Sequence, residues 1–435
     1  MFSPEWVKLR YVLLCLGLYA AGCSAQSSSP TAVSCQNVNN TSASDRYRGG
    51  GSGNALPGNV SKVSIRTLLY RGSQTRIYTR YMPWFGDEHH KDVGYRSDDR
   101  QQVSKQVADM ASRGIQGAII DWYGPEASLK NQSTMWLMKA AEVQGGFEFA
   151  ISEDAGSIRD CEKQGCNPTQ KLISDLNYAA EHFENSSAYL RFGGRPAVFF
   201  FGLEKFPIDW RQVHQSVPLN PLFFFRNSGT FSNPDADGAY AWIAPETANP
   251  GDPMALQYLE RFYSKAQHSD KIAMGSAYKG FNDADANWGK GRVIDQQCGQ
   301  TWLTTFAEAG RFYSEHHQLA ALIIPTWNDY EEGTEVETGI DNCVTVKASI
   351  AGNQLSWSIT GNENSIDHYA ILASGNRSQW KDVTDLPAAS HSVELRDLSL
   401  QPDTNNLCVQ AVGKASILNH FSEPVRYSPQ PAAGP

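Results

Sequence analysis

The 435-residue sequence has little charge, and positive charge is the scarcer kind. Only 19% of its residues are charged, and 37 Lys and Arg stand against 46 Asp and Glu, for a net charge of -9. Because binding to phosphate backbones needs clustered positive charge, this balance argues against a nucleic-acid partner. Apolar residues make up 41% of the chain, which is enough to bury a core and excludes an intrinsically disordered protein.

Several catalytic motifs are absent as well. The chain has no G-x-S-x-G nucleophile elbow, no Walker A loop and no dinucleotide fingerprint after a strand. It has no solenoid repeat. Cys161 and Cys166 form a C-x4-C pair with no second pair and no histidine nearby, which disfavours zinc. These absences favour a chemistry that needs neither a cofactor nor a metal.

The N-terminus has the pattern of an export signal. Lys8 and Arg10 precede an apolar run over residues 11–21, which is too short to span a bilayer and predicts a signal peptide over residues 1–22. The small residues before Cys23 resemble the bacterial lipoprotein box, in which that cysteine is acylated. We therefore expect a membrane anchor at Cys23 and a place on the bacterial cell surface or outer membrane. Ordinary secretion is the alternative, and N-x-S/T sequons leave a eukaryotic host open.

The remaining cysteines agree with export. Once Cys15 and Cys23 are set aside, six are left: Cys35, Cys161, Cys166, Cys298, Cys343 and Cys408. An even number suits disulfides in an oxidising compartment, although the sequence leaves their pairing open. Residues 23–60 are rich in Ser, Asn and Gly, which predicts a flexible tether.

Residues 61–342 alternate short apolar runs with helix-length segments. Continuous apolar runs are typical of parallel strands covered on both faces, and eight such units indicate an α/β (β/α)8 TIM barrel. Between residues 226 and 239, and again after residue 326, there is little room for a helix. The eight expected strands are Ile77–Tyr81, Gly117–Trp122, Phe147–Glu153, Pro196–Phe201, Leu222–Arg226, Ala239–Ile243, Lys271–Ser276 and Ala320–Thr326.

The first connection of the barrel predicts an amphipathic helix. Asp98 and Asp99 stand at its start, and Gly114 ends it. Apolar residues recur between them at helical spacing: Val103, Val107, Met110 and Ala111.

Residues 343–428 show a different pattern. Polar and apolar residues alternate in short segments bounded by Gly, Asn and Pro, which indicates an antiparallel β-sandwich with Trp357 and Tyr369 in its core. The stretch resembles a fibronectin type III module, and residues 429–435 form a tail. The expected strands are Val344–Ser349, Gln354–Ser358, Asp367–Ala373, Ser392–Leu395 and Asn406–Val412.

Carboxylates and aromatic residues gather where the barrel strands end. In such barrels the active site lies at the carboxyl ends of the strands. After the eighth strand, Asp329 and Glu332 lie three residues apart. Glycoside hydrolysis needs two carboxyl groups, and crowded acids keep a proton near neutral pH. The stretch lacks the spacing of a calcium loop, and the Asp87-Glu88-His89-His90 cluster fits a polar subsite loop better than a metal site.

At this point the sequence resembles known families. Residues 327–337, WNDYEEGTEVE, resemble a segment of glycoside hydrolase family 99, the endo-α-mannosidases, as do Tyr81-Met82-Pro83-Trp84-Phe85 and Asp121-Trp122-Tyr123-Gly124. The start at Trp327-Asn328-Asp329 is closer to the α-1,3-glucanases of family 71. The resemblance implies that Glu332 is the catalytic acid and Asp329 its acidic partner. In one family that partner deprotonates the sugar's 2-hydroxyl with net retention, and in the other it activates water and inverts the configuration.

Further strand-end residues are candidates for sugar binding. The indole rings among them suit sugar faces, with a place in the barrel core as the alternative, and the polar groups suit hydroxyls. The candidates are Tyr81, Trp84, Asp121, Trp122, Glu153, Asn227, Trp242, Tyr278, Trp327 and Glu335. We expect a monomeric glycoside hydrolase that cleaves internal α-linkages of a glucan or mannan. The alternative is a surface lipoprotein that binds glycans without turnover.

Overall fold

The computed structural model describes Cys35 and residues 59–428. The expected signal peptide, the lipid-bearing Cys23, most of the tether and the tail over residues 429–435 lie outside the described residues. Within the described part, no helix combines the length and apolar character that a bilayer span requires.

Eight parallel strands form a closed barrel. A nine-stranded sheet runs in the order β3-β2-β1-β11-β8-β7-β6-β5-β4, and β3 also pairs with β5, which closes the ring. The ninth strand, β4 (Arg191–Phe192), is an antiparallel addition to β5. The ring strands are β1 (Arg76–Tyr81), β2 (Gly117–Trp122), β3 (Glu148–Asp154), β5 (Arg195–Phe201), β6 (Leu222–Arg226), β7 (Gly238–Tyr240), β8 (Ile272–Ser276) and β11 (Ala321–Ile324). The expected barrel and its eight strands are thus confirmed.

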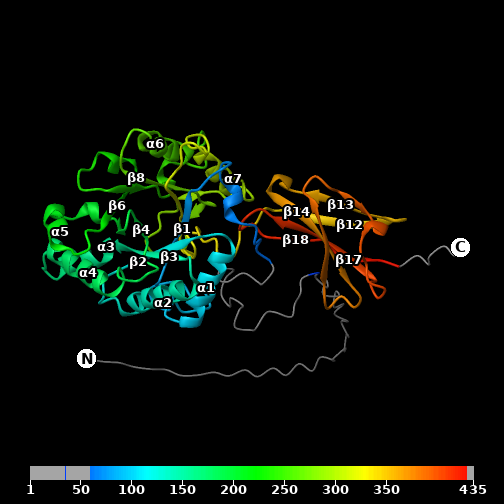
Figure 1. Ribbon diagram of the computed structural model, residues 1–435, viewed down its shortest axis with the longest axis horizontal. Coiled ribbons are helices and arrows are strands. Elements are labelled where there is room, and N and C mark those ends of the chain that lie inside the picture. The colour runs from blue at the N-terminus through cyan, green and yellow to red at the C-terminus, as the bar shows by residue number, and fades with distance from the viewer. Residues whose placement is uncertain (1–34, 36–58, 429–435) are drawn as a thin grey trace, which may run out of the picture. The chain divides into compact units, whose positions relative to one another are not determined.

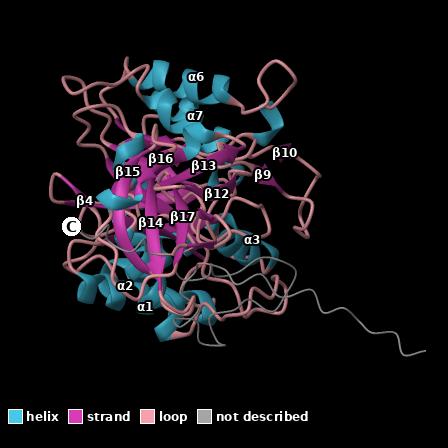
Figure 2. Ribbon diagram, turned by 90° about the vertical axis from the view of Figure 1, so that its right-hand side faces the viewer, coloured by secondary structure: helices cyan, strands magenta, loops and turns pink. Residues whose placement is uncertain are grey.

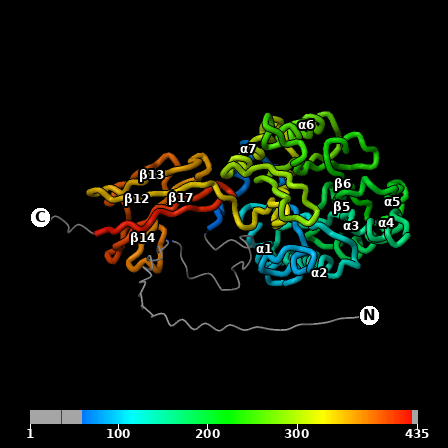
Figure 3. The backbone as a smooth tube through the Cα atoms, turned by 180° about the vertical axis from the view of Figure 1, so that it is seen from behind, coloured from blue at the N-terminus to red at the C-terminus, as the bar shows by residue number. Residues whose placement is uncertain are grey.

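Helices flank this ring (Figure 1), and α3, α4 and α5 pack in sequence along one side of it (Figure 3). Helix α1 matches the pattern expected from the sequence: Asp99 caps it, and its Val103, Val107 and Met110 are buried. The helices are α1 (Arg100–Ser112), α2 (Ser128–Gln144), α3 (Ala155–Lys163), α4 (Pro168–His182), α5 (Trp210–Ser216), α6 (Leu256–Ala266) and α7 (Gln300–Ala309).

The barrel departs from the ideal at the two places where the sequence leaves little room. A short 3-10 helix, Ser228–Ser232, connects β6 to β7 in place of an α-helix. After β11 the chain runs through a loop into the first strand of the C-terminal region. The loop between β8 and α7 also carries a small hairpin, β9 (Phe281–Asn282) and β10 (Val293–Ile294), which the sequence pattern did not predict.

The C-terminal region consists of two antiparallel sheets (Figure 2), as expected. Trp357 and Tyr369 are buried between them with ring centroids 5.3 Å apart. One sheet contains β12 (Thr345–Ala351), β13 (Gln354–Thr360) and β16 (Ser392–Glu394). The other contains β14 (Ile366–Ser374), β15 (Lys381–Pro387), β17 (Asn406–Gly413), β18 (His420–Phe421) and β19 (Val425–Arg426). The edge strand β15 was missed because it is largely exposed and polar.

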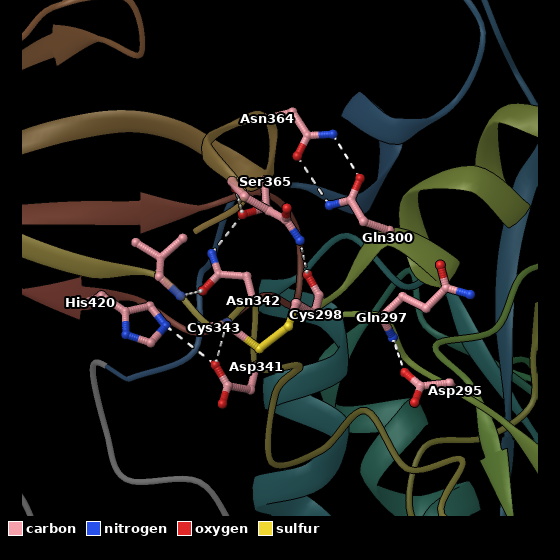
Figure 4. The surroundings of a disulfide bond; sticks show 12 residues. Asp295, Gln297, Cys298, Gln300, Asp341, Asn342, Cys343, Asn364, Ser365 and His420 are labelled. Atoms are coloured by element: carbon pink, nitrogen blue, oxygen red, sulfur yellow. Dashed lines mark hydrogen bonds and ion pairs between the residues drawn. A yellow bond between two sulfur atoms is a disulfide. The ribbon is translucent and has the colours of Figure 1, made fainter. Parts of the chain in front are cut away.

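All six expected cysteines form disulfides. Cys161 pairs with Cys166, as its short spacing allowed, and Cys35 pairs with Cys408 across 373 residues. The third bond joins Cys298, just before α7, to Cys343, just before β12. Figure 4 shows its surroundings, where Gln300 and Asn364 exchange two hydrogen bonds of 3.0 and 2.8 Å. Disulfides of this number indicate an extracellular protein.

Candidate active site

The turn after β11 fixes Asp329 in place. Its backbone N–H donates to the hydroxyl of Thr326 at 2.8 Å. Its carboxylate Oδ1 accepts the backbone N–H groups of Glu331 at 3.0 Å and Glu332 at 2.9 Å. Only 2% of the residue is exposed. A short acidic side chain that caps its own turn is held in one orientation, so the position of this carboxyl is set by the backbone.

Glu332 ends the same turn and is half-buried. Its Oε1 accepts the indole N–H of Trp288 at 3.3 Å, and its backbone carbonyl accepts the N–H of Asn282 at 2.8 Å. Both of these partners come from the loop between β8 and α7. Two loops that are distant in sequence therefore hold the second acid.

Both carboxyl groups have raised pKa values. Burial, and then the nearby Glu332, raise the pKa of Asp329 well above its usual range, although the two backbone N–H groups partly oppose this. Burial also raises the pKa of Glu332, while the Trp288 indole and Arg292 lower it. Burial thus favours the protonated form of both acids, and at Asp329 the charge of Glu332 adds to this effect.

The other acids of this segment have structural partners. Glu331 accepts from His90 and from the backbone N–H of Lys91, each at 2.9 Å. Glu337 accepts from Tyr95, Tyr330 and Gln106, and burial raises its pKa to about 7. Glu335, expected to bind substrate, instead forms a 2.8 Å ion pair with the buried Lys279. Its carboxylate is thus already engaged by the protein.

An aromatic cluster stands beside Glu332. The His90 ring stacks on Trp84, with centroids 4.7 Å apart and planes 5° from parallel. Trp288 packs edge-on against both rings, at 6.2 Å from Trp84 and 5.9 Å from His90. Of the candidate platforms, Trp84 is therefore linked to Glu332 through Trp288.

A second polar cluster lies at the ends of β1, β2 and β3. Arg80 and Asp121 form a buried ion pair, and the Arg80 guanidinium lies 5.3 Å from the ring centroid of Trp242. Burial and the charge of Asp121 raise the pKa of Asp154 to about 7. Asp121 and Trp242 are thus placed near each other, whereas Asp154 and Arg80 were not among the sequence candidates.

Glu153 lies on the wrong face of its strand for the predicted role. It has no exposed surface, and burial together with Asp175 of α4 raises its pKa well above the usual range. Successive side chains on a strand point to opposite faces, so the neighbouring Asp154 is the one beside Asp121. The sequence showed both acids, but nothing in it told which one faces the barrel interior.

All six aromatic candidates are buried, and four of them have no exposed surface at all, whereas Trp84 and Trp242 retain 5%. The hydroxyl of Tyr81 donates to Gln106 of α1, the indole of Trp122 donates to Asn131 of α2, and Tyr278 donates to the Met254 carbonyl. Trp327 is fully buried under the guanidinium of Arg113. Each ring packs against the helix layer or the loops behind the strands, which was the alternative left open for the tryptophans.

Asn227 is held within a hydrogen-bond chain. Its Oδ1 accepts the Tyr258 hydroxyl at 2.7 Å, and that hydroxyl in turn accepts the backbone N–H of Trp242. The side chain therefore supports the strand end that carries Trp242.

Two residues of the site were missed, and the sequence held only a faint signal for them. Trp288 lies in an unpredicted hairpin loop, and His90 was noted only as part of a polar loop.

In the described part of the chain, no group of three or more His, Cys, Asp or Glu side chains is arranged to hold a metal ion.

Comparison with known proteins gives structural likenesses only. No family profile matches the chain, and no curated protein sequence matches it. A solved GH99 endo-α-mannosidase from Bacteroides thetaiotaomicron, in complex with BIS-TRIS-propane, covers 61% of this chain and 87% of its own length, at 17% identity and a TM-score of 0.49. A second structure of that enzyme gives 16% identity and 0.48. Pectate lyase Pel3 from Pectobacterium carotovorum matches 21% of this chain and 28% of its own, at 14% identity and 0.16.

Proposed function

We propose that this protein is a glycoside hydrolase that cleaves internal α-glycosidic bonds of a glucan or mannan. The observation that carries the proposal is the acid pair, a buried Asp329 and a half-buried Glu332, on one turn at the carboxyl end of β11. Carboxylate pairs at this end of a (β/α)8 barrel suit glycoside hydrolysis, which needs no cofactor.

In this proposal Glu332 is the acid. It protonates the glycosidic oxygen as the bond to the anomeric carbon breaks, and the leaving sugar departs as a neutral alcohol. The half-buried position of Glu332 lets substrate reach it, and its raised pKa keeps the proton available.

Asp329 is the partner that removes a proton in its ionised form, which burial opposes and its two backbone N–H donors favour. Either it deprotonates a water molecule that attacks the anomeric carbon, with inversion, or it deprotonates the sugar's own 2-hydroxyl, with net retention. The aspartate carboxyl lies about one methylene further back than a glutamate carboxyl, which favours a water between acid and sugar and so favours inversion.

The sugar would lie over the strand ends that carry Trp84 and Trp242, each 5% exposed, with the largely buried Asp121 and Asp154 within reach of its hydroxyls. The two rings come from the ends of β1 and β7, and the two acids from β2 and β3. Aromatic faces pack on the C–H faces of sugars, and charged acceptors bind hydroxyls more strongly than neutral ones.

Export follows the same proposal. Disulfides and an N-terminal signal suit an exported monomer, anchored through Cys23 on a bacterial surface or secreted without the anchor. The C-terminal sandwich, with its likeness to a fibronectin type III module, would serve as a spacer or packing partner.

The test is release of reducing ends from α-1,3-glucan and α-mannan by the wild type and by Glu332→Gln. We expect release by the wild type and a loss of about 10²–10⁴-fold in the variant. Equal release by both proteins would exclude Glu332 as the acid. Binding without release across a broad glycan panel would replace this proposal with the glycan-binding alternative.

A further inference from the structure

Trp288 has an unusual position for a tryptophan. It is 43% exposed, on the loop between β9 and β10. The buried Asp283 holds this loop together. Its carboxylate accepts the backbone N–H groups of Lys290 at 3.1 Å and Arg292 at 2.7 Å. A large ring is thus held by the backbone of its loop with part of its surface open to solvent, where it can stack on a sugar ring.

The ring also touches Glu332, one of the two acids. Its indole N–H donates to Glu332, and its edge lies against Trp84 and His90. The indole is therefore bonded to the acid at one side and open to solvent at the other.

We propose that Trp288 forms the wall of the subsite for the leaving-group sugar and positions the carboxyl of Glu332 there. This rests on the proposed function. The acid must lie beside the glycosidic oxygen, and the sugar on the far side of that oxygen is the leaving group. A ring bonded to the acid is consequently placed along that sugar.

The indole N–H also contributes to the charge balance around Glu332. Arg292 and Trp288 lower the pKa of Glu332, whereas burial, Asp283 and Asp121 raise it. Asp329 lies on the same turn, and His90 is engaged by Glu331. Removal of the N–H alone should raise the pKa of the acid.

The first experiment separates the leaving group from the rest of the substrate. Trp288→Ala and the wild type are compared on an α-linked oligosaccharide and on a disaccharide α-fluoride, mannobiosyl or glucobiosyl, whose leaving group is not a sugar and needs no protonation. We expect kcat/KM to fall about 10-fold or more on the oligosaccharide and less than about 3-fold on the fluoride. The large exposure of Trp288 makes the variant compatible with folding, which the thermal melt checks.

The second experiment tests the positioning role. Trp288→Phe keeps a ring and loses the N–H, so the basic limb of kcat/KM should move up by about 0.5 pH unit. Trp136→Phe on α2 is the matched control and should leave both readouts unchanged. Equal losses on the two substrates, or none on the oligosaccharide, overturn the subsite. If the basic limb of kcat/KM does not move in Trp288→Phe, the positioning role is overturned. No wild-type turnover of either substrate overturns the proposed function and this inference with it.

Discussion

The barrel and the sandwich treat charge differently. The barrel buries ionisable side chains at its strand ends and behind them, including Arg80, Asp121, Glu153, Asp329 and Glu331. Among the described residues 343–428, none of the buried polar side chains is charged. A buried charge is costly unless it is paired or put to use, whereas an apolar core gains stability at no such cost. The barrel therefore bears the cost of burying charged groups, and the sandwich does not.

Neutralising the proposed base should have the largest effect on activity. Asp329→Asn keeps an oxygen that can accept the two turn N–H groups but cannot remove a proton. We expect kcat to fall about 10³–10⁴-fold with a melting temperature at or above that of the wild type. Steady-state kinetics and a thermal melt measure the two effects. A variant that loses stability and activity in parallel would make Asp329 a structural cap.

A substitution in the sandwich core should have the opposite result, a loss of stability without a loss of activity. Trp357→Ala removes a ring that packs on Tyr369, and should cost about 3–5 kcal/mol of unfolding free energy in the transition that reports the sandwich. Below that transition, kcat on the oligosaccharide should stay within about 2-fold of the wild type. Urea unfolding followed by fluorescence gives the first quantity. A large fall in kcat while the protein is folded would mean that the sandwich serves the site directly.

Glu184, a buried acid away from the site, tests what burial of a carboxyl costs in stability. Burial raises the pKa of Glu184 to about 7 in the folded protein. The unfolded chain ionises near its usual value, so the wild type loses stability as pH rises between about 4.5 and 7, by about 3 kcal/mol in all. Glu184→Gln lacks this loss.

We therefore expect Glu184→Gln to match the wild type near pH 4.5 and to exceed its unfolding free energy by about 2–3 kcal/mol at pH 8. Urea unfolding at the two pH values measures this. Glu142→Gln is the control, because Glu142 has a lowered pKa through Ser186 and Lys139 and should gain nothing at pH 8. A pH-independent effect of Glu184→Gln would refute the burial argument.

The smallest effect is expected at Asp154. Asn still accepts the Gly156 N–H that begins α3, so Asp154→Asn removes the charge and keeps the cap. We expect kcat/KM to fall about 10-fold through weaker hydroxyl binding, with little change in melting temperature. Asp209→Asn, at the start of α5, is the matched capping control. Unchanged kinetics at Asp154 would remove the β3 end from the substrate site.

Much of the barrel was predictable because its signals are local. Buried parallel strands read as continuous apolar runs, and their order around a closed ring follows the chain. The acid pair was predictable for the same reason, since Asp329 and Glu332 share one turn. Cys161 and Cys166 likewise lie close in sequence.

Other features depend on which way a side chain points. Asp121 and Trp122 are neighbours on β2, yet one faces Arg80 and the other packs on Asn131. A shift of one residue in the register of a strand moves each side chain from one face of the sheet to the other. A continuous apolar run does not mark which residues face the barrel interior. This is why Glu153 was chosen in place of Asp154.

The sequence by itself therefore determined the kind of fold and the place of the two candidate acids on one turn, because both follow from residues close together in the chain. Tertiary structure decided the environment of those acids. Trp288 meets Glu332, and Cys35 meets Cys408, across 44 and 373 residues. Such contacts form only when the packing of the whole chain brings distant loops together, and no short stretch of sequence carries that information.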